Sequence, residues 1–124
     1  KESNQFKWLG RVDNVINSSE SLNTTILDTA NKLSINVNYG TILTADVFTV
    51  YADIRHILEK MPKHLKILAN EMEAFGLFHV ANLCGKEATC LMTIVDSPYE
   101  DVMISENDKV KNLNDMIVLA LESI

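Results

Sequence analysis

Leu65-Lys66-Ile67-Leu68-Ala69, a short aliphatic run, leads directly into Asn70-Glu71-Met72-Glu73-Ala74. The aliphatic run is typical of a buried strand. The apolar run from Phe75 to Gly85 is long enough for a helix, with Gly85 as its C-cap. Acidic side chains are rarely buried without a partner, so packing alone poorly explains two carboxylates flanking a methionine at a strand-to-helix junction. Ligands of open α/β folds bind at the carboxyl ends of strands, so the junction predicts a site for a polar ligand. The alternative is that Glu71 and Glu73 only begin the helix, where anions suit the helix dipole.

The composition is that of one globular domain. The chain has 124 residues, of which 47% are hydrophobic, and its formal net charge is -6. This acidic balance argues against nucleic acid and anionic membranes as partners, and no apolar run approaches the roughly 18 residues of a membrane span. Neither the cysteines nor the histidines have the spacing of a metal site, and no cofactor motif is present. We expect Cys84 and Cys90 to be reduced thiols of a cytoplasmic protein.

Strand-like and helix-like segments alternate along the chain, which indicates an α/β fold with a mainly parallel or mixed sheet flanked by helices. Helices are predicted over residues 22–33, capped within Ser19-Glu20-Ser21, over 51–61 and 75–85, and from the capping-box-like pair Ser105 and Asp108 to the C-terminus. Strands are predicted over residues 34–43, 65–69 and 88–95. The last helix has one apolar stripe, made of Val110, Leu113, Ile117, Ala120 and Ile124.

Residues 1–124 are predicted to be a single domain that is incomplete as given. Two strands that are apolar throughout need neighbours at both edges and helices on both faces, and exposed apolar edges favour aggregation. We therefore expect another segment to complete the sheet. The chain begins at Lys1 rather than at an initiator methionine, which fits a longer product.

Four stretches together resemble one known family. They are Ala45-Asp46-Val47-Phe48, Glu71-Met72-Glu73-Ala74, Thr93-Ile94-Val95-Asp96 and the segment 114–123, which begins Asn114-Asp115-Met116-Ile117. In this order and spacing they resemble the C-terminal half of the hexameric, bacterial-type purine nucleoside phosphorylases, over nearly the whole chain. A related hydrolase branch also has a Met-Glu pair and a strand-end Asp, whereas the Asn-Asp-Met-Ile helix is more similar to the phosphorylases.

The resemblance implies a nucleoside site at the junction. In the family, the residue at the Glu73 position accepts hydrogen bonds from the ribose hydroxyls, which suits an ionised carboxylate with two acceptor oxygens. Met72 would pack on the sugar, where its flexible apolar chain conforms to the ring. Glu71 would line the same pocket, and Phe48 would stack on the purine.

The resemblance also implies that Asp96 is the catalytic acid. Protonation of purine N7 neutralises the charge that develops on the departing base. The carboxyl group must then hold a proton well above the ordinary Asp pKa of about 3.9, which requires a desolvated site. Lys109 stands where the family has an assisting Arg, and it lacks the forked donor geometry of a guanidinium. Val95, counted with the substrate-binding residues, stands where many relatives have Ser. From its position alone, Asp96 could equally cap a turn at a strand end.

The phosphate-binding parts of the family have no counterpart here. A Gly-Asp-Pro-x-Arg motif is absent, and Arg11 and Arg55 are the only arginines. The resemblance implies reversible phosphorolysis of purine (deoxy)nucleosides by a complete homo-oligomeric protein, a hexamer in the family, with inorganic phosphate as co-substrate. We expect the 124 residues alone to be inactive. The alternatives are a hydrolytic nucleosidase of the same superfamily and a non-catalytic nucleoside-binding protein.

Overall fold

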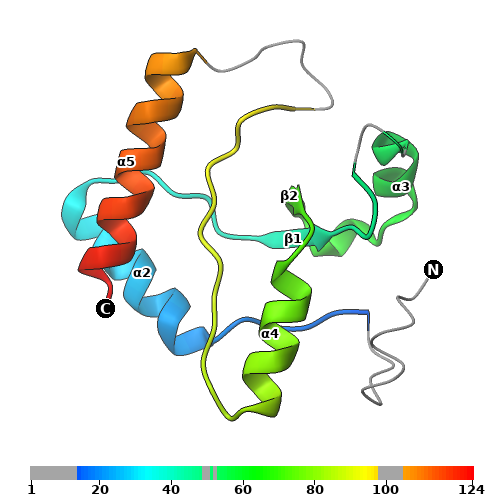
Figure 1. Ribbon diagram of the computed structural model, residues 1–124, viewed down its shortest axis with the longest axis horizontal. Coiled ribbons are helices and arrows are strands. Elements are labelled where there is room, and N and C mark those ends of the chain that lie inside the picture. Colours follow the sequence, from blue (N-terminus) through cyan, green and yellow to red (C-terminus); the bar gives the residue numbers. More distant parts are fainter. Residues whose placement is uncertain (1–13, 49–50, 52, 98–104) are drawn as a thin grey trace.

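The computed structural model describes residues 14–48, 51, 53–97 and 105–124. In chain order the elements are the helix α2 (Glu20–Leu33), the strand β1 (Thr41–Thr44), the helix α3 (Ile54–Lys60), the 3-10 turn η2 (Lys63–Leu65), the strand β2 (Ile67–Glu71), and the helices α4 (Ala74–Leu83) and α5 (Glu106–Glu122). β1 and β2 pair in parallel and are connected through α3. In Figure 1, α2 and α5 lie on one side of the strands and α3 on the other. The fold is thus α/β, a small parallel sheet flanked by helices, as predicted.

Helix α2 begins and ends as its sequence indicates. The Ser19 hydroxyl caps it by accepting an N–H of the first turn at 3.3 Å. At the other end, Ser34 adopts a left-handed conformation with φ 56°. The N–H of Ile35 then reaches the carbonyl of Ala30 at 2.9 Å, and that of Ser34 reaches Asn31 at 3.2 Å. These two bonds are the Schellman arrangement, in which a glycine is the usual residue at the left-handed position.

The two strands are shorter than predicted or displaced along the chain. β1 covers only the end of the predicted 34–43 strand. β2 begins two residues later than predicted, because η2 occupies the preceding turn. Their register places Thr41 opposite Ile67 and Thr44 opposite Glu71, so both strands end at the same level. One further bond, from the Ala45 N–H to the Glu71 carbonyl at 2.8 Å, extends the pairing beyond the strand ends.

The strand predicted over residues 88–95 is wrong, because this segment has no regular secondary structure. The carbonyl of Ala88 accepts the Ser19 N–H at 2.8 Å. The Thr89 hydroxyl donates to an asparagine of α2 at 2.6 Å, and the Thr93 hydroxyl reaches a backbone carbonyl of α5 at 3.4 Å. A strand requires a neighbouring strand edge to satisfy its backbone, and among the described residues this apolar segment instead follows α2 and α5.

Helices α3 and α4 agree with their predicted positions to within a few residues. α3 begins at Ile54, and the side chain of Asp53 accepts the His56 N–H at 3.1 Å. Residue 52 of the predicted helix lies outside the described residues. α4 ends in a second Schellman arrangement. Gly85 has φ 62°, and the Lys86 N–H reaches back five residues to a carbonyl of the last turn at 2.8 Å. Gly85 therefore ends the helix as predicted.

Helix α5 packs on α2 through a different face from the one its apolar stripe predicts. The Ser105 hydroxyl caps it by accepting the Asp108 N–H at 3.2 Å, as expected. Leu119 is its buried residue, whereas Val110, Leu113, Ile117 and Ile124 of the predicted stripe are exposed, as is Ala120. The helix carries more apolar residues than its contacts cover, so Leu119 is buried and the longer stripe stays exposed. Within the described residues, the buried apolar side chains are Ala30, Ala74, Phe78 and Leu119.

Candidate functional site

The junction between β2 and α4 is held by one acidic side chain. Glu71 is half-buried at the end of β2. Its Oε2 accepts the N–H groups of Glu73 and Ala74, both at 2.6 Å, and its Oε1 accepts the hydroxyl of Thr44 from the neighbouring strand. The Thr44 hydroxyl in turn accepts the Phe75 N–H at 3.1 Å. We call these four hydrogen bonds the junction network.

The junction network supplies the N-terminal cap of α4. Glu73 is the residue before the helix, and its own side chain makes no capping bond. The first N–H groups of a helix have no partner within it and need acceptors from elsewhere. Glu71 and Thr44 provide these acceptors, and a carboxylate at this end also suits the helix dipole. The contacts of Glu71 therefore agree with the alternative given for it above, a carboxylate that begins the helix.

The side chains of Glu73 and Met72 are exposed to solvent at the same junction. The carboxylate of Glu73 is exposed, and its Oε2 accepts the Met72 N–H at 3.3 Å. Its Oε1 has no hydrogen-bond partner among the described residues. The side chain of Met72 is 42% exposed. This carboxylate retains acceptor capacity for polyol hydroxyls, with an apolar thioether chain beside it.

Phe48 lies four residues beyond the end of β1, on the segment leading toward α3. Its ring is 56% exposed. It packs against the ring of Tyr51 edge to face, with centroids 6.4 Å apart and planes at 63°. One face of an edge-to-face pair stays available to a flat ligand, and such a ligand gains from stacking on it.

Val95, Asp96 and Lys109 are not brought together in the structure. Val95 and Asp96 are exposed at the end of the segment 88–97. Lys109, in the first turn of α5, pairs with Glu106 of the same turn, with Nζ and Oε1 3.0 Å apart. No contact joins Asp96 to Lys109, or either of them to Glu73, among the described residues. The desolvated setting expected for a catalytic acid is therefore not formed around Asp96.

Cys90, on the segment 88–97, lies within electrostatic range of Glu71. Burial raises the pKa of its thiol, and the negative charge of Glu71 raises it further. Cys84, at the end of α4, is exposed, and both cysteines are free thiols. These surroundings make Cys90 a poor nucleophile, because the thiolate is the reactive form.

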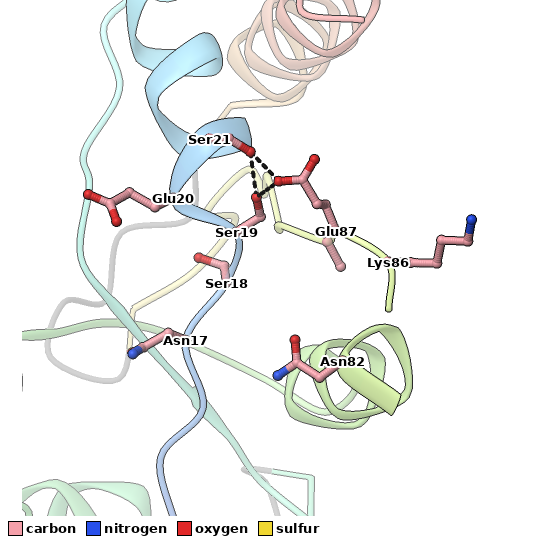
Figure 2. A pocket seen from close by; sticks show the side chains of 9 residues that line it. Asn17, Ser18, Ser19, Glu20, Ser21, Asn82, Lys86 and Glu87 are labelled. Carbon is pink, nitrogen blue, oxygen red and sulfur yellow. Dashed lines mark hydrogen bonds between the residues drawn. The ribbon is translucent and has the colours of Figure 1, made fainter. Parts of the chain in front are cut away.

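A shallow hollow of about 340 Å³ lies at the N-terminus of α2, away from the predicted site residues. Figure 2 shows the Glu87 carboxylate directed at this helix end, where it accepts the hydroxyls of Ser21 and of Ser19, the latter at 2.7 Å. These hydrogen bonds, that of Ser21 foremost, lower the pKa of Glu87. A protein carboxylate thus already occupies the place where an anionic ligand would bind.

The chain matches the sequence model of the phosphorylase superfamily over residues 10–122, nearly its whole length. This chain belongs to the phosphorylase superfamily. Among curated relatives it is 36% identical to a purine nucleoside phosphorylase of Aliivibrio salmonicida over 76% of the chain and 39% of the relative. It is 38% identical to that of Colwellia psychrerythraea over 84% of the chain and 43% of the relative. It is 31% identical to that of Psychromonas ingrahamii over 99% of the chain and 50% of the relative. All three are named as DeoD-type, and the chain spans about half their length or less.

Sequence reasoning missed one residue at the site of this phosphorylase superfamily chain. Thr44 donates to Glu71 and accepts from the first turn of α4, although no motif in the sequence marks it. Its signal was its position. Parallel strands end at the same edge of a sheet, so the last residue of β1 should meet the last residue of β2.

Two properties of the described residues bear on ligands and membranes. No three His, Cys, Asp or Glu side chains gather there as metal ligands would. No helix of residues 14–48, 51, 53–97 and 105–124 is long and apolar enough to cross a bilayer.

Proposed function

We propose that the complete protein catalyses the reversible phosphorolysis of purine (deoxy)nucleosides to the purine base and (deoxy)ribose 1-phosphate. Inorganic phosphate is the co-substrate, and no other cofactor takes part. Membership of the phosphorylase superfamily and relatives named purine nucleoside phosphorylase support this reaction. The single observation behind the proposed sugar site is the Glu73 carboxylate. It is exposed just after β2, and its Oε1 has no hydrogen-bond partner among the described residues.

The sugar is held at the β2–α4 junction in this proposal. Glu73 accepts the ribose hydroxyls, and hydrogen bonds to a charged acceptor contribute about 1.5–3 kcal/mol each. Met72 covers the apolar face of the sugar. Glu71 lies beneath them and lines the site through its bonds to the backbone of Glu73 and Ala74.

The base is held by Phe48 and Val95, both of which have exposed apolar surface to offer. Asp96 protonates N7 of the departing purine as general acid, a contribution of about 10²- to 10⁴-fold in rate. Lys109 supports Asp96 with its positive charge. For this, Lys109 must leave Glu106, with which it pairs in the structure.

Phosphate must be held and aimed at C1′ of the sugar from the face opposite the base. Among the described residues, Arg55 is the sole arginine, and it lies on α3. The carboxylates of Glu71 and Glu73 make the local field negative, which opposes phosphate binding unless other groups offset it. We therefore expect the 124 residues by themselves to be inactive, and the complete protein to be a homo-oligomer, a hexamer by family resemblance.

Phosphate dependence tests the reaction class. The purified complete protein is incubated with inosine and with adenosine, with and without phosphate, and the free base and the sugar products are quantified. Phosphorolysis predicts base release only with phosphate, together with ribose 1-phosphate. Base release without phosphate, and no ribose 1-phosphate when phosphate is restored, would instead establish a hydrolytic nucleosidase.

Two variants and one control test the assigned roles. Glu73→Ala should raise KM for ribonucleosides at least tenfold, since it removes charged hydrogen bonds to the sugar. Asp96→Asn should lower kcat about 100-fold or more, because it removes the general acid. Glu59→Gln, an exposed change on α3, should leave both constants unaltered. Unaltered kinetics in Asp96→Asn would exclude it as the acid.

A non-catalytic nucleoside-binding protein is the second candidate. The exposed Asp96 and the pairing of Lys109 with Glu106 favour it, since neither residue is set for acid catalysis in the structure. Calorimetry that shows inosine or adenosine binding by a protein without turnover would establish this function.

A further inference from the structure

Thr44 joins two strand ends and a helix start through a single hydroxyl. It is the last residue of β1 and lies opposite Glu71, the last residue of β2. Its hydroxyl donates its proton to Oε1 of Glu71 and accepts the N–H of Phe75 at 3.1 Å. A hydroxyl is one donor and up to two acceptors, so this position uses both capacities at once. An apolar side chain of the same shape would provide neither bond.

The hydrogen bond from Thr44 to Oε1 of Glu71 orients the carboxylate so that Oε2 faces the backbone. With Oε1 held by Thr44, Oε2 receives the N–H groups of Glu73 and Ala74, both at 2.6 Å. These short bonds to a charged acceptor fix the backbone at the point where the chain turns from strand to helix. The backbone of Glu73 is thus held through Glu71 and Thr44, while its carboxylate remains exposed.

We propose that Thr44 is a positioning residue for the Glu73 carboxylate, acting through Glu71. This rests on the proposed function, in which Glu73 accepts the hydroxyls of a nucleoside sugar. Besides lining the pocket, Glu71 then serves the site by ordering the backbone of Glu73. Loss of the Thr44 hydroxyl releases Oε1 of Glu71 and removes one acceptor of the Phe75 N–H. The first turn of α4 then loosens, and Glu73 loses the fixed position that sugar binding needs.

The test compares three variants of the purified complete protein with the wild type. Thr44→Val removes the hydroxyl and keeps the shape, Thr44→Ser keeps the hydroxyl, and Thr41→Val makes the same apolar change at the start of β1. Amide hydrogen exchange at residues 73–75 reports on the junction network without any ligand. Calorimetric titrations with inosine and with hypoxanthine separate binding of the sugar from binding of the base.

We expect Thr44→Val to speed amide exchange at Glu73 and Ala74. It should also weaken inosine binding about tenfold relative to hypoxanthine binding, while Thr44→Ser and Thr41→Val resemble the wild type. Unchanged exchange in Thr44→Val would overturn the junction network itself. Faster exchange with an unaltered ratio of inosine to hypoxanthine affinity would show that Thr44 is structural only, and would overturn the proposal. A wild type that binds neither compound would contradict the proposed function and the role of Thr44 toward a sugar. The exchange rates would still show separately whether the junction network exists.

Discussion

Replacing Leu119 by alanine should destabilise the chain more than any other truncation on α5. The side chain is 1% exposed, on a helix that contacts α2. The substitution removes three carbons, and at about 0.8 kcal/mol for each the lost transfer energy is about 2.4 kcal/mol. The cavity left behind brings the expected loss to about 2–5 kcal/mol. The buried apolar core of the described residues is small, so this loss is a large share of the total stability.

Urea denaturation followed by circular dichroism measures this loss, and Leu121→Ala on the same helix is the matched control. Leu121 is 63% exposed, so its truncation should change the unfolding free energy by less than about 1 kcal/mol. Leu113→Ala tests the stripe that the sequence favoured, and in the structure its side chain is also exposed. If Leu113→Ala cost more than Leu119→Ala, the packing of α5 on α2 would be incorrect.

Three further predictions concern single side chains. Ser34→Gly should stabilise the chain by about 0.5–1 kcal/mol in the same assay, because Ser34 has φ 56° and glycine adopts the left-handed region without strain; a loss of stability would refute this. The lowered pKa of Glu87 means that its stabilising contribution is complete above about pH 4.3, the ordinary Glu pKa, and is lost as the pH falls through the lowered value. Glu87→Gln should therefore flatten the pH dependence of the unfolding free energy below about pH 4.3, and an unaltered profile would contradict its bonds to Ser19 and Ser21. Iodoacetamide should alkylate the exposed Cys84 before Cys90, whose thiol pKa is raised, and mass spectrometry showing the reverse order would contradict the burial of Cys90.

The local signals in the sequence predicted local structure well. Ser19 and Ser105 cap α2 and α5, and Gly85 ends α4, because each of these effects depends on a few neighbouring residues. The run 65–74 likewise predicted a strand leading into a helix at a carboxylate-rich junction. The functional family also followed from the order and spacing of short stretches, and the match over residues 10–122 confirms it.

The parts that failed depend on contacts between distant segments. The run 88–95 is apolar enough for a buried strand, but apolarity does not provide a partner edge, and here the segment lies along α2 and α5 instead. Helix α5 has two apolar faces, and its sequence cannot decide which one α2 covers. The contacts between side chains at the site also depend on distant segments. Thr44 and Glu71 meet through strand register, so the sequence brings them together only once the ends of both strands and their parallel pairing are known. The expected domain limits, and the site roles taken from the family, stay predictions.

The exposed residues 94–96 connect assembly to the proposed chemistry. A general acid that protonates a purine near neutral pH must carry a proton, and a carboxyl group keeps one only where water is excluded. Asp96 is exposed, and so are its neighbours Ile94 and Val95 and, on the other segment, Phe48. A surface that buried these apolar side chains would gain about 25 cal/mol for each Å² removed from water. That same burial would desolvate Asp96. In the proposed function, covering Ile94 to Asp96, whether by a neighbouring subunit or by more of the same protein, would therefore stabilise the assembly and desolvate the acid together. Activity then depends on assembly, which gives a physical reason to expect the 124 residues alone to be inactive.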